Sequence, residues 1–273
     1  NTTGSNNTAT GESSLKANTT GTRNAAFGGT TLDACTTGND NTAVGYAALS
    51  ASTTASQSTA VGYAALLLNT ANQNTALGAQ ALRANTTGTY NVGVGNSALR
   101  ANTTANNNTA VGFRSLMTST TSSENTAIGS AALELMTTGS ANTAVGHRAL
   151  EASTTASQNV AVGQRALYQQ TTGEKNTALG WNAGGSITGA SFNTYVGQRA
   201  GDANSSSNNT AVGSESLSSN CGPENTAVGS NALLECTGAR NVGVGASALA
   251  ANSTGSSNVA VGGFAGKALT TGG

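Results

Sequence analysis

The chain has 273 residues, including 36 glycines and one proline, and its 11 basic side chains balance 11 acidic ones. Charged residues make up only 8% of the sequence, so clusters of Lys and Arg that would bind nucleic acid or anionic membranes are not expected. No apolar run approaches the roughly 18 residues of a membrane span, and the N-terminal segment shows no signal-peptide pattern, so we expect no membrane insertion.

A pentapeptide typified by Asn41-Thr42-Ala43-Val44-Gly45 recurs sixteen times along the sequence. Its copies begin at Asn7, Asn24, Asn41, Ser58, Asn74, Asn91, Asn108, Asn125, Asn142, Asn159, Asn176, Asn193, Asn209, Asn225, Asn241 and Asn258. Eleven of the spacings are 17 residues and four are 16, so nothing is inserted within the array. The sequence therefore predicts one continuous repeat array over residues 1–273, with a partial coil at 1–6, sixteen coils at 7–273 and no second domain.

Each copy, numbered from position one at its Asn, begins with a short predicted strand followed by a corner. In Thr42–Val44 a small residue separates two β-branched ones, which is the period-two pattern of a strand with Thr42 and Val44 on the same face. Position five is glycine in all sixteen copies, Gly45, Gly62 and Gly112 among them. Glycine adopts positive φ and allows close backbone approach, so we interpret it as the corner residue.

The second half of each copy is predicted to contain another strand and a return turn. Ala48 and Leu49 are expected to begin the second strand, and the Thr-Thr-Gly segment that follows in most copies is expected to make the turn. A helix is the alternative for Ala-Leu segments such as 131–135, although none is longer than two turns.

A repeat of 17 residues is too short for the two helices of a helical solenoid but suits one coil of a β-solenoid. We therefore predict an all-β fold, a parallel β-solenoid or β-roll of sixteen coils of 16–17 residues, spaced by about 4.8 Å. Stacked Asn side chains such as Asn41 and Asn125 would form an amide ladder along the axis. Val44, Leu49 and the alanines would form a thin core. Because such a core buries little apolar surface, we expect a lateral partner and hence a homo-oligomer.

The run Asn-Thr-Ala-Val-Gly-x-x-Ala-Leu is similar to the repeats of phage tail-fibre and tail-fibre-domain proteins. It also resembles the head repeat of trimeric autotransporter adhesins, which reads roughly N-S-V-A-I-G-x-x-A. The resemblance covers all sixteen copies. It implies a left-handed parallel β-roll in which three chains lie side by side as a surface-exposed attachment fibre.

No set of residues in the sequence suggests catalysis or a cofactor. His147 is the only histidine, so neither a catalytic triad nor a zinc site is expected, and we interpret it as a surface residue. Position seven is arginine in four copies (Arg114, Arg148, Arg165 and Arg199), which forms a broken basic line that either contacts an acidic glycan or partner chain or only aids solubility. Position ten carries charges of both signs and is expected to face outward.

The threonine columns at positions thirteen and fourteen support a rival function. One outward Thr per coil would present a regular array of hydroxyl and methyl groups, the kind of surface that ice-binding proteins use. Adjacent residues point to opposite sides, however, so only one of the two columns would face outward. Nine Asn-x-Ser/Thr sequons also occur, including Asn18, Asn85, Asn102, Asn204 and Asn252, and chance explains most of them in a chain of this composition.

The three cysteines divide into one isolated residue and one candidate pair. Cys35 and Cys236 share position twelve but lie thirteen coils apart, about 60 Å in the expected stack. Cys221 and Cys236 occupy neighbouring 16-residue coils, within the range of a disulfide if both side chains point the same way. We therefore predict that they form a bond in an oxidising compartment and that Cys35 stays free. The alternative is that all three are small buried apolar residues.

These patterns together predict a non-enzymatic structural protein without a cofactor. We expect a fibre shaft, exposed on a virion or cell surface, that serves attachment as a rigid spacer, most simply as a trimer, with a surface glycan or receptor as a further partner. The first alternative is an extracellular filament subunit that stacks head-to-tail, because neither end carries a recognisable cap. The second is an ice-binding β-solenoid.

Overall fold

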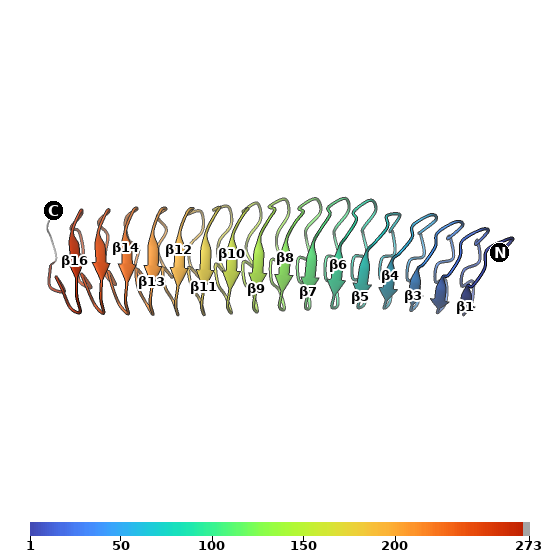
Figure 1. Cartoon of the computed structure of the whole chain (residues 1–273), viewed down its shortest axis with the longest axis horizontal. Coiled ribbons are helices and arrows are strands. Elements are labelled where there is room, and N and C mark those ends of the chain that lie inside the picture. The colour runs from blue at the N-terminus through green and yellow to red at the C-terminus, as the bar shows by residue number, and fades with distance from the viewer. Residues whose placement is uncertain (270–273) are drawn as a thin grey trace. The chain divides into compact units, whose positions relative to one another are not determined.

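The structure, a computed structural model, describes residues 1–269 and confirms the predicted fold class. Every regular element in this range is a three-residue β-strand, one in each repeat, and the range contains no helix. Within residues 1–140 and within residues 141–269, consecutive strands pair in parallel, so the chain folds as a β-solenoid (Figure 1). Without a helix, no segment of residues 1–269 is a candidate for a helical membrane span.

The strands fall into two compact units, Asn1–Ser140 and Ala141–Gly273. The first unit contains β1 (Thr8–Thr10), β2 (Ala25–Phe27), β3 (Thr42–Val44), β4 (Thr59–Val61), β5 (Thr75–Leu77), β6 (Val92–Val94), β7 (Thr109–Val111) and β8 (Thr126–Ile128). The second contains β9 (Thr143–Val145), β10 (Val160–Val162), β11 (Thr177–Leu179), β12 (Thr194–Val196), β13 (Thr210–Val212), β14 (Thr226–Val228), β15 (Val242–Val244) and β16 (Val259–Val261). Each unit is built from the same repeat, and residues 270–273 of the predicted array lie outside the described residues.

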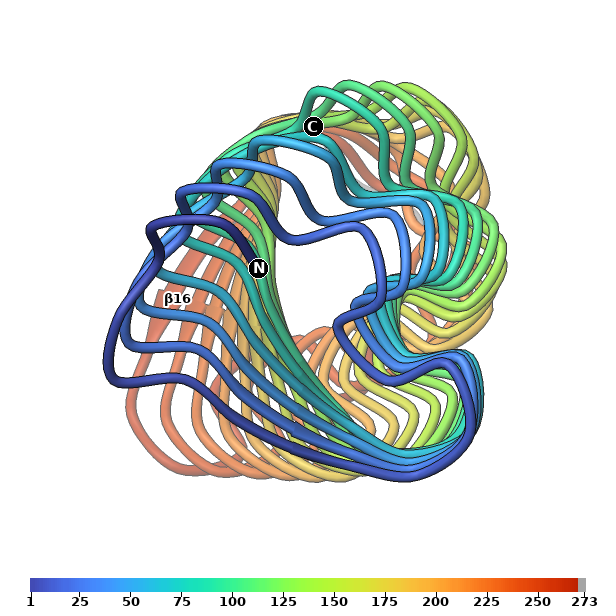
Figure 2. The same cartoon turned by 90° about the vertical axis from the view of Figure 1, so that its right-hand side faces the viewer.

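Equivalent residues of neighbouring coils lie directly beside one another. Thr42–Val44 pairs residue for residue with Thr59–Val61, and the backbone N–H of Thr42 donates to the carbonyl of Ser58 at 2.9 Å. The 16-residue coil that starts at Ser58 keeps the same register with β5. Within each unit successive coils therefore follow nearly the same path when viewed along the stack (Figure 2).

The corner after each strand requires glycine for two reasons. Gly45 has φ 123° and Gly112 has φ 137°, a region that residues with a side chain rarely adopt. A Cβ on Gly112 would also lie 2.5 Å from the carbonyl oxygen of Gly129 in the next coil, closer than real Cβ atoms approach. Positive φ and close stacking together account for the glycine in every copy.

The prediction of a second strand at Ala48–Leu49 is wrong. Ala47 and Leu49 adopt left-handed φ values of 57° and 51°, so the chain turns repeatedly here instead of extending. The turns still bond from coil to coil, because the N–H of Leu49 donates to the carbonyl of Ala65 at 3.0 Å. The alternating conformation brings Leu49 fully inward, which offsets the cost of about 1–2 kcal/mol that an L-residue pays in this region.

The expectation that Val44 belongs to the core is also wrong. Val44 is 37% exposed, whereas Ala43 between it and Thr42 is completely buried. Alternation along the strand correctly puts Thr42 and Val44 on one face, but that face is the outer one. A coil of 17 residues encloses a narrow interior, which the alanines of the strands and the leucines of position nine fill.

Asparagines at position one form the ladder that holds the coils in register. Asn41 is buried, and its Oδ1 accepts a bond from the backbone N–H of Ser58 at 3.0 Å. Its Nδ2 donates to Asn24 Oδ1 at 3.1 Å and to the carbonyl of Ala55 at 2.8 Å. Asn125 makes the equivalent bond with its backbone N–H to Asn108 Oδ1 at 2.9 Å. Each amide thus links three consecutive coils.

A second ladder, which the sequence did not suggest, runs along position twelve. Asn102 Nδ2 donates to Asn85 Oδ1 at 2.7 Å, and Asn85 Nδ2 donates to Asn69 Oδ1 at 2.6 Å. This column is broken wherever a copy has another residue there, such as Ser119 after Asn102. The Oδ1 atom of Asn102 is accordingly buried without a hydrogen-bond partner.

One coil of the second unit fills its interior differently. Tyr195 occupies the central position of β12, where the other copies have Ala or Gly, and is completely buried. Gly201 in its own coil and Gly184 in the preceding one replace the usual leucine. A Cβ would lie 2.3 Å from the Tyr195 ring at Gly201 and 2.9 Å from it at Gly184. The ring therefore occupies the space that two leucines fill elsewhere.

Candidate interaction surface

The outer face of the strands is a repetitive surface that extends along each unit. We call it the Thr–Val face and define it as the first and third residues of strands β1–β8 in the first unit and of β9–β16 in the second. Threonine is the commonest first residue and valine the commonest third. Large apolar side chains on it are substantially exposed, among them Leu77 at 38% and Ile128 at 40%.

No charged residue occurs on the Thr–Val face in either unit, although the chain has 22 charged residues. Exposed aromatic residues follow the corner glycine at position six and extend the apolar surface beside the strands. Tyr46 and Tyr63 stack in neighbouring coils with ring centroids 6.1 Å apart, and Phe113 and Trp181 are exposed at the equivalent position. Uncharged apolar surface of this extent is typical of surfaces that a partner covers.

The arginines of position seven do not form a free basic line. Arg114 pairs with Glu134 at 2.7 Å, and Arg199 pairs with Asp202 at 3.2 Å and with Glu215 at 3.4 Å. Glu134 and Asp202 are each only 8% exposed, so the expectation that position ten faces outward is wrong for these two residues.

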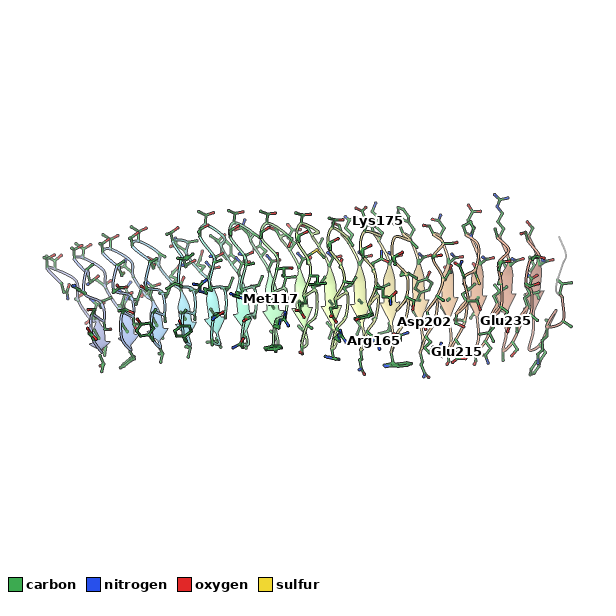
Figure 3. The ribbon with its side chains drawn as sticks, turned by 180° about the vertical axis from the view of Figure 1, so that it is seen from behind. Met117, Arg165, Lys175, Asp202, Glu215 and Glu235 are labelled. Atoms are coloured by element: carbon green, nitrogen blue, oxygen red, sulfur yellow. The ribbon has the colours of Figure 1, made fainter. Side chains whose placement is uncertain are left out.

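The other two arginines of this column are also engaged. Arg148 forms an ion pair with Glu151, and the Arg165 guanidinium lies over the Tyr168 ring at 4.5 Å from its centroid. Figure 3 shows Glu215, which pairs with Arg199, on one side of the coils and Lys175 on the opposite side. The paired column offers little free positive charge to an acidic glycan, which favours the interpretation that these arginines aid solubility and packing.

The threonine column at position thirteen uses its hydroxyl groups within the protein. Thr36 Oγ1 donates to the carbonyl of Thr53 at 3.1 Å, and Thr103 Oγ1 donates to that of Thr120 at 3.0 Å. Position fourteen is exposed, as at Thr104. Part of the hydroxyl array considered for ice binding is thus already engaged in hydrogen bonds between coils.

The remaining candidate residues from the sequence are His147 and the sequon asparagines. His147 is exposed, and no cluster of three or more metal-ligating side chains and no pocket occurs within residues 1–269. Five sequon asparagines are buried in the position-twelve column: Asn18, Asn85, Asn102, Asn204 and Asn252. A glycan on any of them would prevent the coil from closing.

All three cysteines are buried free thiols in the structure. Cys35 Sγ lies 3.8 Å from the carbonyl oxygen of Gly38 in the first unit, and burial raises its pKa. Cys221 and Cys236 in the second unit are both buried, and each side chain lies close enough to shift the pKa of the other. The Cys236 side chain, together with burial, raises the pKa of Cys221, and the Cys221 side chain lowers the pKa of Cys236.

Known proteins give no direct evidence about this chain. It matches no protein-family model, no curated protein and no solved structure. The surface of the molecule itself therefore provides the observations that bear on its function.

Proposed function

We propose that this chain is a non-enzymatic structural fibre shaft, exposed on a virion or cell surface, whose copies associate laterally through the Thr–Val face. The observation that carries the proposal is the absence of charge from that face along all sixteen strands, combined with the exposure of its Val, Leu, Ile and Phe side chains. Charge depletion of this kind marks the centre of protein interfaces.

The size of the face fits a second copy of the chain. Eight strands at about 4.8 Å give each unit a face about 34 Å long, and two outward columns with their side chains make it about 10 Å wide. Each unit then offers roughly 350 Å², and the two units of one chain together roughly 700 Å². A stable interface buries about 800 Å² on each partner, so a partner presenting the same face would provide a matching area.

Two further features support a spacer. Each coil is tied to its neighbours by the Asn41-type ladder and by backbone bonds, so side chains that could serve a ligand are used for stacking. The residues of the repeat resemble those of trimeric fibres, and we propose three copies on that ground. A shaft of this kind would hold an attachment element, such as one that binds a glycan or receptor, away from the surface that carries it.

The proposal is tested by sedimentation of the full chain and of variants in neighbouring coils. Val61→Lys combined with Leu77→Lys introduces two charges on the Thr–Val face, whereas Thr54→Lys combined with Thr87→Lys introduces two on exposed corners of the same unit. We expect the wild-type chain and the corner variant to sediment as trimers and the face variant to sediment as a folded monomer. A wild-type chain that is a folded monomer at micromolar concentration would refute the lateral association, and a head-to-tail polymer that the face variant leaves intact would favour the filament.

Ice binding remains the second candidate because the structure presents a two-column array different from the one at positions thirteen and fourteen. Threonine and valine on the outer face of each strand, as in Thr109 and Val111, form two outward columns with the regular spacing of the sheet. Clear thermal hysteresis by the wild-type monomer, lost in the Val61→Lys and Leu77→Lys variant, would favour this function over the fibre.

A further inference from the structure

Cys221 and Cys236 lie in one column because the coil containing Cys221 is laid out unusually. Cys236 follows its leucine, Leu233, by three residues, as is usual at position twelve, whereas Cys221 follows Leu217 by four. The extra residue, Asn220, turns outward. Its Oδ1 accepts a bond from Ser205 Oγ of the preceding coil at 2.6 Å. The displacement brings Cys221 inward, at 1% exposure, above the fully buried Cys236.

The backbones that carry the two cysteines are also in close contact. A Cβ on Gly222 would lie 2.7 Å from the carbonyl oxygen of Gly238 in the next coil, so the segments just after the two cysteines stack directly. Coils at the usual spacing place such residues at about 5 Å, within the 4.4–6.8 Å between Cα atoms that a disulfide spans. Both thiols make weak bonds to carbonyl oxygens, Cys221 with Leu233 at 3.7 Å and Cys236 with Gly238 at 3.4 Å, and Cys236 Sγ also accepts a weak bond from Asn241 Nδ2 at 3.7 Å.

We propose that Cys221 and Cys236 form a disulfide that joins two consecutive coils of the second unit when the chain folds in an oxidising environment. The bond would replace the position-twelve ladder where that ladder is missing. In the first unit, amides such as Asn85 and Asn102 connect the coils at this column. Near the cysteines the column has no such connection, and Asn204 Nδ2 in the coil before Cys221 is buried without a hydrogen-bond partner.

The chemistry requires one external disulfide, for example oxidised glutathione. The Cys236 thiolate attacks a sulfur of that disulfide, forming a mixed disulfide and releasing one glutathione thiolate, which takes up a proton. Cys221 then loses its proton and attacks the Cys236 sulfur, forming the protein disulfide and releasing the second glutathione. Two protein thiols are oxidised and one external disulfide is reduced. Both thiols are buried in the folded protein, so exchange takes place while the chain folds.

The test is to refold the full chain with oxidised and reduced glutathione and to map its thiols. Glu-C protease cleaves after Glu224, between the two cysteines, so their peptides remain joined only by a disulfide. We expect joined peptides that separate on reduction, and one alkylated thiol per chain, on Cys35, under denaturing conditions. Closing a loop of this length should raise Tm by roughly 5–10 °C relative to the reduced protein.

Two variants keep the result interpretable. Cys35→Ser should leave the joined peptides and no free thiol, whereas Cys236→Ser should abolish the joined peptides while circular dichroism still reports a folded chain. Three free thiols in the refolded, folded wild-type protein would overturn the proposal. So would a disulfide that joins Cys35 to either of the other two. Neither outcome bears on the lateral association of copies, which is measured independently by sedimentation.

Discussion

The packing of Tyr195 against Gly184 and Gly201 leads to a prediction about stability. Substitutions at these positions that destabilise the protein one at a time should stabilise it when combined. Tyr195→Ala restores the usual residue of the strand but leaves the space of the ring empty, because Gly184 and Gly201 have no side chains to fill it. Truncating a buried aromatic side chain costs about 3–5 kcal/mol. The phenol oxygen of Tyr195 has no hydrogen-bond partner, so its removal returns about 1–3 kcal/mol. We expect a net loss of about 2 kcal/mol.

Leucine in place of Gly184 or Gly201 should destabilise the fold when Tyr195 is present. It should stabilise the fold when Tyr195 is replaced by alanine. Gly201→Leu alone places a Cβ against the Tyr195 ring. This overpacking should lower the free energy of unfolding by about 1–3 kcal/mol. Gly184 and Gly201 have φ of 59° and 62°, close to the 50° of Leu167, so their backbone accepts leucine. In the triple variant Tyr195→Ala, Gly184→Leu, Gly201→Leu, two buried leucines return about 1.5–3 kcal/mol each. The triple variant should therefore be at least as stable as the wild type.

The assay is urea denaturation followed by circular dichroism for the wild type, Tyr195→Ala, Gly201→Leu and the triple variant. Tyr90→Ala serves as the control, because Tyr90 is 57% exposed and its removal should change stability little. Two destabilising single substitutions should become neutral or stabilising when combined, a coupling of several kcal/mol. If the losses of the single variants simply add in the combined one, the ring does not occupy the leucine space and the argument fails.

Two further predictions follow from the corner and from the tyrosine. Gly112→Ala should lower the free energy of unfolding by about 3–5 kcal/mol, from backbone strain and the clash with Gly129, whereas Gly29→Ala, whose Cβ would meet only the Tyr46 ring at 3.4 Å, should change it by less than about 1 kcal/mol. Equal losses in thermal melts of the two variants would contradict this. Burial, and secondarily the proximity of Cys221, raises the pKa of Tyr195, so the neutral phenol is favoured in the folded state. The stability that this provides is complete below the unfolded pKa of about 10 and is lost as pH rises above it. Wild-type Tm should therefore fall more steeply than that of Tyr195→Phe between about pH 9 and 11, and parallel curves would rule this out.

Repetition made the strands, the corner glycine and the position-one asparagines predictable. Sixteen copies of one pattern show which positions tolerate no change, and Gly45 and Asn41 have simple physical roles that any stack of coils would require. The side of the strand that faces inward was not predictable in the same way. Period-two alternation groups Thr42 with Val44 but is silent about which group is buried, and ordinary hydrophobicity wrongly favours Val44 over Ala43.

Two further features required the structure for a different reason. The turn at Ala47 and Leu49 depends on left-handed backbone that no propensity assigns to these residue types. The inward column of position twelve left only a weak signal, since it holds Asn, Ser, Cys, Met, Ile, Gln and Leu but never a charged residue. Tyr195 with Gly184 and Gly201 was visible as three departures from the repeat, and their size complementarity in adjacent coils could have connected them.

The identical register between neighbouring strands has a consequence for how such a gene can change in length. A coil meets the same hydrogen-bonding edge above and below whichever copies flank it, as the pairing of β3 with β4 and of β4 with β5 shows. Unequal recombination that removes or duplicates whole repeats therefore leaves the backbone donors and acceptors matched at each new junction. The coils of Gly184 and Tyr195 are the exception. A crossover between them would place the Tyr195 ring against a leucine in one product and would leave the space beside Gly184 empty in the other. These two repeats are therefore expected to be inherited together.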